Sequence, residues 1–143
     1  MKKYLLLVLA FILFSSCNST KIENSKTNFS LEKLCDEWLY VNSYEGILTK
    51  IDTLNKEVKK YKYYTPSLTY RKEGTYTNYQ GDYQDNGTFI FNKKTGIIKE
   101  FYNMGSTKVE SQSRLTYLDN GYLLMVVFEN EKESTSTFFY KKR

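Results

Sequence analysis

The sequence predicts an all-β fold, an antiparallel up-and-down barrel of about eight strands. Aromatic residues make up 17% of the 143 residues, with 14 Tyr and 9 Phe. From Trp38 onward, apolar and polar residues alternate with the period of two that is typical of half-buried strands. Gly-containing turns divide this region into short antiparallel segments, and closing such a sheet into a barrel leaves no unpaired edge.

The expected strands follow one another along the chain with short connections. They span residues 38–44, 68–71, 75–79, 88–92, 97–102, 114–118, 122–128 and 135–141, with a weak strand near residue 107. A short helical turn at 31–35 precedes the first strand, and Ser30 is placed to cap it. Asn120 and Gly121 lie between two strands, and this pair tolerates the positive φ of a tight hairpin turn.

The segment between the first two strands has a different pattern. Its apolar residues recur at spacings of three and four, and most of its lysines lie between them. The apolar set is Ile47, Ile51, Leu54, Val58 and Tyr61. This spacing predicts one amphipathic helix at 47–61, and a long loop is the alternative that the composition leaves open.

The beginning of the chain has the pattern of an export signal. Lys2 and Lys3 precede an apolar run, residues 4–14, that is shorter than the roughly 20 residues needed to cross a bilayer. The following Phe14-Ser15-Ser16-Cys17 resembles the lipobox of bacterial lipoproteins. The resemblance implies a lipoprotein signal peptide at 1–16 and fatty acyl chains such as palmitate on Cys17. An ordinary secretory signal cut near Ser19 is the alternative.

Residues 17–30 are rich in Asn, Ser, Thr and Lys, and we expect them to form the acylated Cys17 and a flexible tether. The barrel domain is then expected at 31–143. The lipobox resemblance implies a lipid-anchored membrane protein of the cell envelope. No acidic run follows Cys17, and we expect the domain to face the periplasm.

The composition excludes several classes of function. The chain has no histidine and only two cysteines, which removes histidine-dependent catalysis and the common zinc sites. Losing Lys2 and Lys3 with the leader lowers the formal net charge from +5 to +3, too little to indicate nucleic acid. We therefore expect a monomer that is not an enzyme, holds no metal or cofactor, and meets the membrane through Cys17.

Trp38, the single tryptophan, follows the short helical turn and opens the first strand, and the chain ends in Phe138-Phe139-Tyr140-Lys141-Lys142-Arg143. With the strand pattern, this resembles the bacterial lipocalin-like domain family over residues 31–143. Asp36 stands where that family has glycine. The resemblance implies that Trp38 plugs the base of the barrel, with Arg143 lying across it, and that the barrel holds a small, largely apolar ligand.

Alternation fixes which residues share a face of each strand, and we take the more apolar set as the barrel interior. The predicted ligand-binding residues are Tyr76, Phe89, Phe91, Phe101, Leu115, Tyr117, Phe138 and Tyr140. Tyrosine rings suit a small apolar or aromatic ligand, because each offers a flat face and a hydroxyl. The alternative is a filled barrel that acts as a protein-interaction or inhibitor module.

Overall fold

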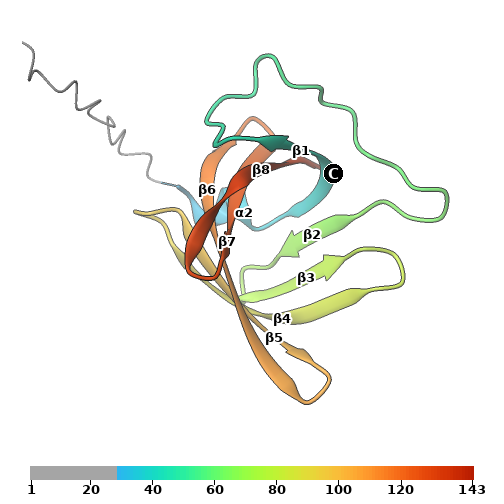
Figure 1. Ribbon diagram of the computed structural model, residues 1–143, viewed down its shortest axis with the longest axis vertical. Helices are drawn as coiled ribbons and strands as arrows, with labels where there is room; N and C mark the ends of the chain where they lie inside the picture. The colour runs from blue at the N-terminus through green and yellow to red at the C-terminus, as the bar shows by residue number, and fades with distance from the viewer. Residues whose placement is uncertain (1–28) are drawn as a thin grey trace, which may run out of the picture.

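The computed structural model describes residues 29–143, and the predictions for the signal peptide, for Cys17 and for the tether as far as residue 28 lie outside this range. The described chain forms a closed barrel of eight antiparallel strands, as predicted (Figure 1). In order, its elements are α2 (Leu31–Leu34), β1 (Glu37–Glu45), β2 (Ser67–Tyr70), β3 (Thr75–Tyr79), β4 (Gln84–Asn92), β5 (Ile97–Met104), β6 (Thr107–Asp119), β7 (Tyr122–Glu129) and β8 (Lys132–Lys142).

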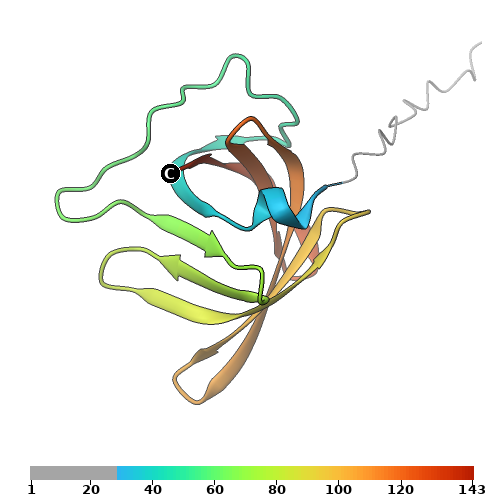
Figure 2. The ribbon, with the colours of Figure 1, turned by 180° about the vertical axis from the view of Figure 1, so that it is seen from behind.

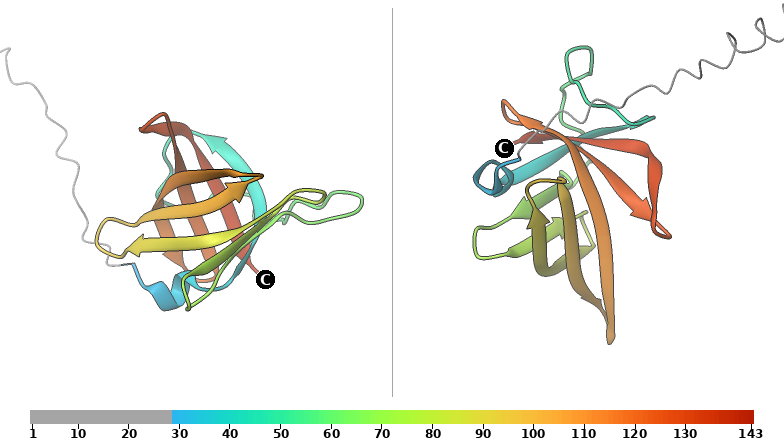
Figure 3. Two further views of the ribbon diagram at one scale, coloured as in Figure 1. Left: turned by 90° about the horizontal axis from the view of Figure 1, so that it is seen from below. Right: turned by 90° about the vertical axis from the view of Figure 1, so that its left-hand side faces the viewer.

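Each strand pairs with the next along the chain, and β1 pairs with β8 to close the barrel. The views in Figure 3 show the sheet curving round on itself, with the hairpin of β5 and β6 reaching beyond its neighbours. The weak strand expected near residue 107 and the one at 114–118 are a single strand, β6. Asn120 and Gly121 have φ values of 51° and 76°, so the predicted tight turn between β6 and β7 is confirmed.

One end of the barrel is filled by side chains. Trp38 is only 2% exposed, and its indole Nε1 donates to the Leu34 carbonyl of α2 at 2.8 Å. Around it, the interior holds the buried side chains Leu68, Tyr70, Tyr76, Phe89, Ile98, Leu115, Leu118, Leu123 and Met125. Figure 2 shows α2 lying across this closed end. Phe29 packs against the same core, and its N–H donates to the Lys93 carbonyl at 3.1 Å, so the barrel's contacts begin before residue 31.

The predicted helix at 47–61 is wrong, because this segment is an extended connection from β1 to β2 with a turn at residues 52–54 (Figure 1). We call residues 46–66 the strap. Ile51, with Leu48, Leu54 and Val58, packs on Val41, Leu124 and Phe139 of the sheet's outer face. The Thr137 hydroxyl ties the strap down, since it donates to the Gly46 carbonyl at 2.7 Å and accepts from the Leu48 N–H at 2.9 Å. Ile51, Leu54 and Val58 are therefore packed against the sheet without a helix, whereas Ile47 and Tyr61 remain exposed.

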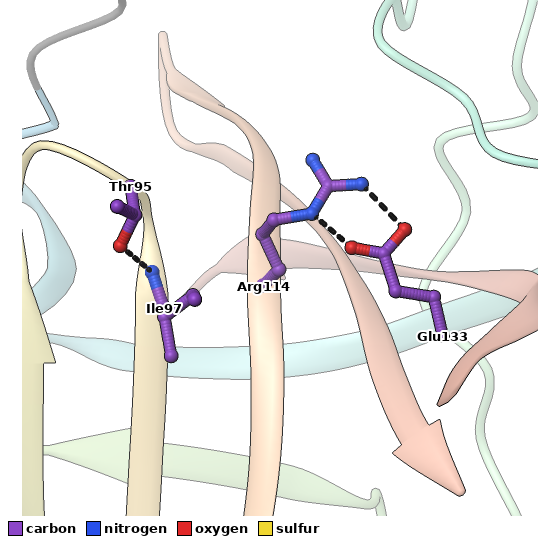
Figure 4. Close-up of polar contacts among 4 residues, drawn as sticks. All are labelled: Thr95, Ile97, Arg114 and Glu133. Atoms are coloured by element: carbon purple, nitrogen blue, oxygen red, sulfur yellow. Dashed lines mark hydrogen bonds and ion pairs between the residues drawn. The ribbon is translucent and has the colours of Figure 1, made fainter. Parts of the chain in front are cut away.

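A charged pair supports the outer face farther along the barrel. Arg114 of β6 and Glu133 of β8 form a two-pronged ion pair across β7, with Nη2 and Oε2 2.8 Å apart (Figure 4). Both side chains are partly buried, and the pair raises the pKa of Arg114 and lowers that of Glu133. Thr95, at the turn before β5, accepts a hydrogen bond from the Ile97 N–H at 3.3 Å in the same view.

In the part of the chain that the structure describes, no helix is long and apolar enough to span a membrane.

Candidate binding pocket at the mouth of the barrel

A pocket of about 270 Å³ opens at the end of the barrel away from α2, where β1 and β2 separate. These two strands pair only from Glu37 to Leu39, because the strap enters β2 at Pro66. The pocket is lined by Tyr40, Tyr61, Tyr64, Pro66, Ser67, Asn78, Gln80, Phe138 and Tyr140. We call it the mouth pocket. Five of its nine lining residues are aromatic, so it offers ring faces together with amide and hydroxyl groups.

The rim of the mouth pocket is fixed by Tyr64 of the strap. Its ring stacks on Tyr61 at a centroid distance of 4.9 Å and meets the edge of Tyr79 at 6.2 Å. The same ring lies against Gly81, where a Cβ would come within 2.7 Å of it. Gly81 therefore provides the space that lets the strap lie against the turn between β3 and β4.

The floor of the mouth pocket comes from β1 and β8. Tyr40 and Tyr140 pair in register, and their rings meet edge to face at 5.8 Å. Burial raises the pKa of the Tyr140 hydroxyl, and the nearby Glu100 carboxylate raises it further. The pocket floor is thus a pair of phenol rings, and the Tyr140 ring lies close to a partly buried acid.

That acid is the centre of a polar network inside the barrel. Glu100 accepts hydrogen bonds from the Tyr70 hydroxyl at 2.5 Å and from the Ser111 hydroxyl at 2.8 Å. Burial raises the pKa of Glu100, the two donors oppose that rise, and the charge of Asp85 adds to it. Burial and the Glu100 charge also raise the pKa of Tyr70 and of Tyr76. The middle of the barrel interior is therefore polar and acidic, although its base is apolar.

Asp85 is a second acid inside the barrel. The strand expected at 88–92 in fact begins earlier, at Gln84, and Asp85 is buried and paired in register with Asn78 of the mouth pocket. A hydrogen bond to Asp85 is the main cause that raises the pKa of Tyr83. Alternation could have predicted the longer strand, because Asp85, Gly87, Phe89 and Phe91 lie at every second position along it.

The structure brings six of the eight predicted ligand-binding residues together in the barrel interior. They are Tyr76, Phe89, Phe91, Leu115, Phe138 and Tyr140. Only Phe138 and Tyr140 line the mouth pocket, whereas the other four belong to the packed core. Sequence reasoning missed the remaining lining residues, since most lie on the strap or at the ends of short strands.

Phe101 and Tyr117 are corrections, because both lie on the outer side of the barrel. In β5 the interior side chains are Ile98, Glu100 and Tyr102, which leaves Phe101 on the opposite face. In β6 the register shifts between Leu115 and Tyr117, and Tyr117 packs in the outer cluster beneath the strap. A bulge of this kind moves every later side chain of the strand to the other face.

The expected Arg143–Trp38 contact is also a correction. Trp38 is paired in register with Lys142, whereas the Arg143 guanidinium forms an ion pair with Glu37 at 3.0 Å. Lys142 shares with Trp38 a shallow recess of about 290 Å³ and makes an ion pair with Asp36 at 2.5 Å. The basic side chain at the base of the barrel is therefore Lys142, one residue earlier than predicted, because Glu37 and Trp38 point to opposite faces.

A larger recess of about 710 Å³ lies outside the barrel, between the strap and the end of β8. Lysines and Arg143 line it, but Lys142 forms an ion pair with Asp36 and Arg143 forms one with Glu37.

Within residues 29–143, no group of three or more Cys, Asp or Glu is arranged to hold a metal ion. Comparison of the chain with protein-family models, with curated proteins and with solved structures finds no match.

Proposed function

We propose that this chain is a lipid-anchored protein of the cell envelope, facing the periplasm, whose lipocalin-like barrel holds one small ring-bearing ligand and performs no chemistry on it. The observation that carries the binding proposal is the mouth pocket, with five aromatic side chains around about 270 Å³. That volume lies just below the roughly 300–1,000 Å³ of common ligand sites, so the ligand is small. Tyrosines supply both apolar contact and hydrogen bonds, which suits an aromatic ligand with polar substituents.

The binding proposal is tested with a neutral fluorescent naphthalene, with binding measured by titration and by the shift in melting temperature. Tyr64→Ala removes a rim ring, and we expect it to weaken binding about tenfold, from the loss of aromatic packing. Tyr63→Ala is the matched control, because Tyr63 is 83% exposed and does not line the pocket. Native mass spectrometry of the chain isolated from its own cells would identify a bound ligand.

A filled barrel that binds another protein is the second candidate, and the packed closed end favours it. If wild-type protein binds no naphthalene, and Tyr64→Ala changes only the free energy of unfolding, the rings are core and this second candidate replaces the first.

The anchoring proposal is tested by metabolic labelling with an alkyne fatty acid. We expect Cys17→Ala to abolish labelling and Cys35→Ala to retain it, because Cys35 packs against the barrel core. Label that persists in Cys17→Ala would contradict the lipoprotein assignment.

A further inference from the structure

The carboxylates that face the barrel interior give the mouth pocket an acidic surrounding. Asp85 is 9% exposed and lies opposite Asn78, which lines the pocket. Glu100 is bound by Tyr70 and Ser111, and its charge raises the pKa of Tyr140 on the pocket floor. Among the ion pairs in residues 29–143, none involves Asp85 or Glu100, and none of the nine lining residues is basic.

The interior also holds a polar group that the fold does not use. Ser113 lies two residues beyond Ser111 on the same face of β6 and is 4% exposed. Within the described chain its hydroxyl has no hydrogen-bond partner. Buried polar groups are normally satisfied, so this unpaired hydroxyl adds to the polar character of the barrel interior beside Glu100, although Ser113 does not line the mouth pocket.

The aromatic side chains of the pocket favour the same sign of charge. The face of a tyrosine ring carries negative electrostatic potential, and ammonium groups bind over such faces. Tyr40, Tyr64 and Tyr140 come from three different segments and converge on one pocket. The aromatic rings that line the pocket and the carboxylates of Asp85 and Glu100 in the interior therefore both favour a cation.

We propose that the mouth pocket binds an organic cation, a primary or methylated ammonium carried on a small apolar or aromatic body. This inference rests on the proposed function and names the chemical class of its ligand. The body packs on Tyr64 and Phe138, and the ammonium group points toward Asn78 and the Asp85 carboxylate behind it. An anion of the same shape is excluded, because no basic group of the lining can compensate its charge.

Three probes that share a naphthalene group and differ in charge test the ligand class. They are a naphthylethyl trimethylammonium, a neutral ethylnaphthalene and a naphthylacetate, each titrated into the purified chain by calorimetry and fluorescence. We expect the cation to bind at least about tenfold more tightly than the neutral probe and the anion not to bind.

Asp85→Asn keeps the size of the side chain and removes its charge, and we expect it to lose most of the cation's advantage while the neutral probe binds as before. Glu110→Gln is the matched control, because Glu110 is exposed on the outer face of β6 and pairs with Lys99 at 2.8 Å. A neutral probe that binds wild type as tightly as the cation overturns this inference and leaves the proposed function standing. If none of the three probes binds, both fail. The cation-to-neutral ratio in wild type decides the matter even where Asp85→Asn does not fold.

Discussion

Gly81→Ala tests whether the rim of the mouth pocket is set by contact between Tyr64 and the turn after β3. Gly81 has φ +78°, and a Cβ there would meet the Tyr64 ring at 2.7 Å. Gly105, in the turn between β5 and β6, has φ +62° with nothing within 4 Å of its Cβ position. Both alanines carry the left-handed backbone penalty of about 1–2 kcal/mol, but only Gly81→Ala must also displace a ring.

The displaced ring makes two aromatic contacts, with Tyr61 and with Tyr79. At about 0.5–1.5 kcal/mol each, their loss adds about 1–3 kcal/mol to the cost of Gly81→Ala over Gly105→Ala. Urea unfolding of the two variants measures this difference, and titration with the neutral naphthalene shows whether the pocket has changed. Equal stability and equal probe binding in the two variants would refute the conclusion that Gly81 positions the Tyr64 ring.

Three further predictions concern other parts of the barrel. Trp38→Ala should lower the free energy of unfolding by about 3–5 kcal/mol, and wild-type Trp38 should emit at blue-shifted wavelengths, whereas emission like that of free indole would contradict its burial. Burial raises the pKa of Glu100 above its ordinary 4.5. Protonated Glu100 therefore stabilises the folded state fully when the pH is below 4.5, and this stabilisation is lost as the pH rises through the pKa of the folded state. Glu100→Gln should therefore show a smaller loss of stability between about pH 4 and pH 8 than wild type, and an equal loss would exclude this assignment. Ile51→Ala should lower the free energy of unfolding by about 2–5 kcal/mol because Ile51 is 7% exposed, whereas Ile47→Ala, at an exposed position, should lower it little. Similar losses for the two variants in urea unfolding would argue against a packed strap.

Alternation was a sufficient guide wherever a strand was regular and one face was clearly apolar. In β4 and β8 it placed Phe89, Phe91, Phe138 and Tyr140 inside, as the structure has them. In β5 both faces carry two large apolar residues and one charge, so composition could not distinguish them. The correct face holds Glu100, whose burial depends on donors from β2 and β6 that no local pattern reveals.

The other errors arise where the chain departs from regular geometry. The bulge after Leu115 turns Tyr117 outward, and nothing in the local sequence marks it. Ile51, Leu54 and Val58 have helical spacing because an extended strap also presents an apolar residue every few positions to the sheet beneath it. The mouth pocket depends on contacts between the strap and strands far along the chain, so its rim could not be predicted from either segment alone.

Closure of the barrel by β1 and β8 has a consequence for the order of events in folding. Tyr40 pairs with Tyr140, about 100 residues later, and the strap is held by Thr137 of the same last strand. Contacts so distant in sequence form slowly, and here they need the chain to have been synthesised as far as β8. Until β8 arrives, β1 has an unpaired edge and the strap has no seat. That interval is when one molecule can add its strand to another, so dimers by strand exchange are most readily formed from chains that are still incomplete.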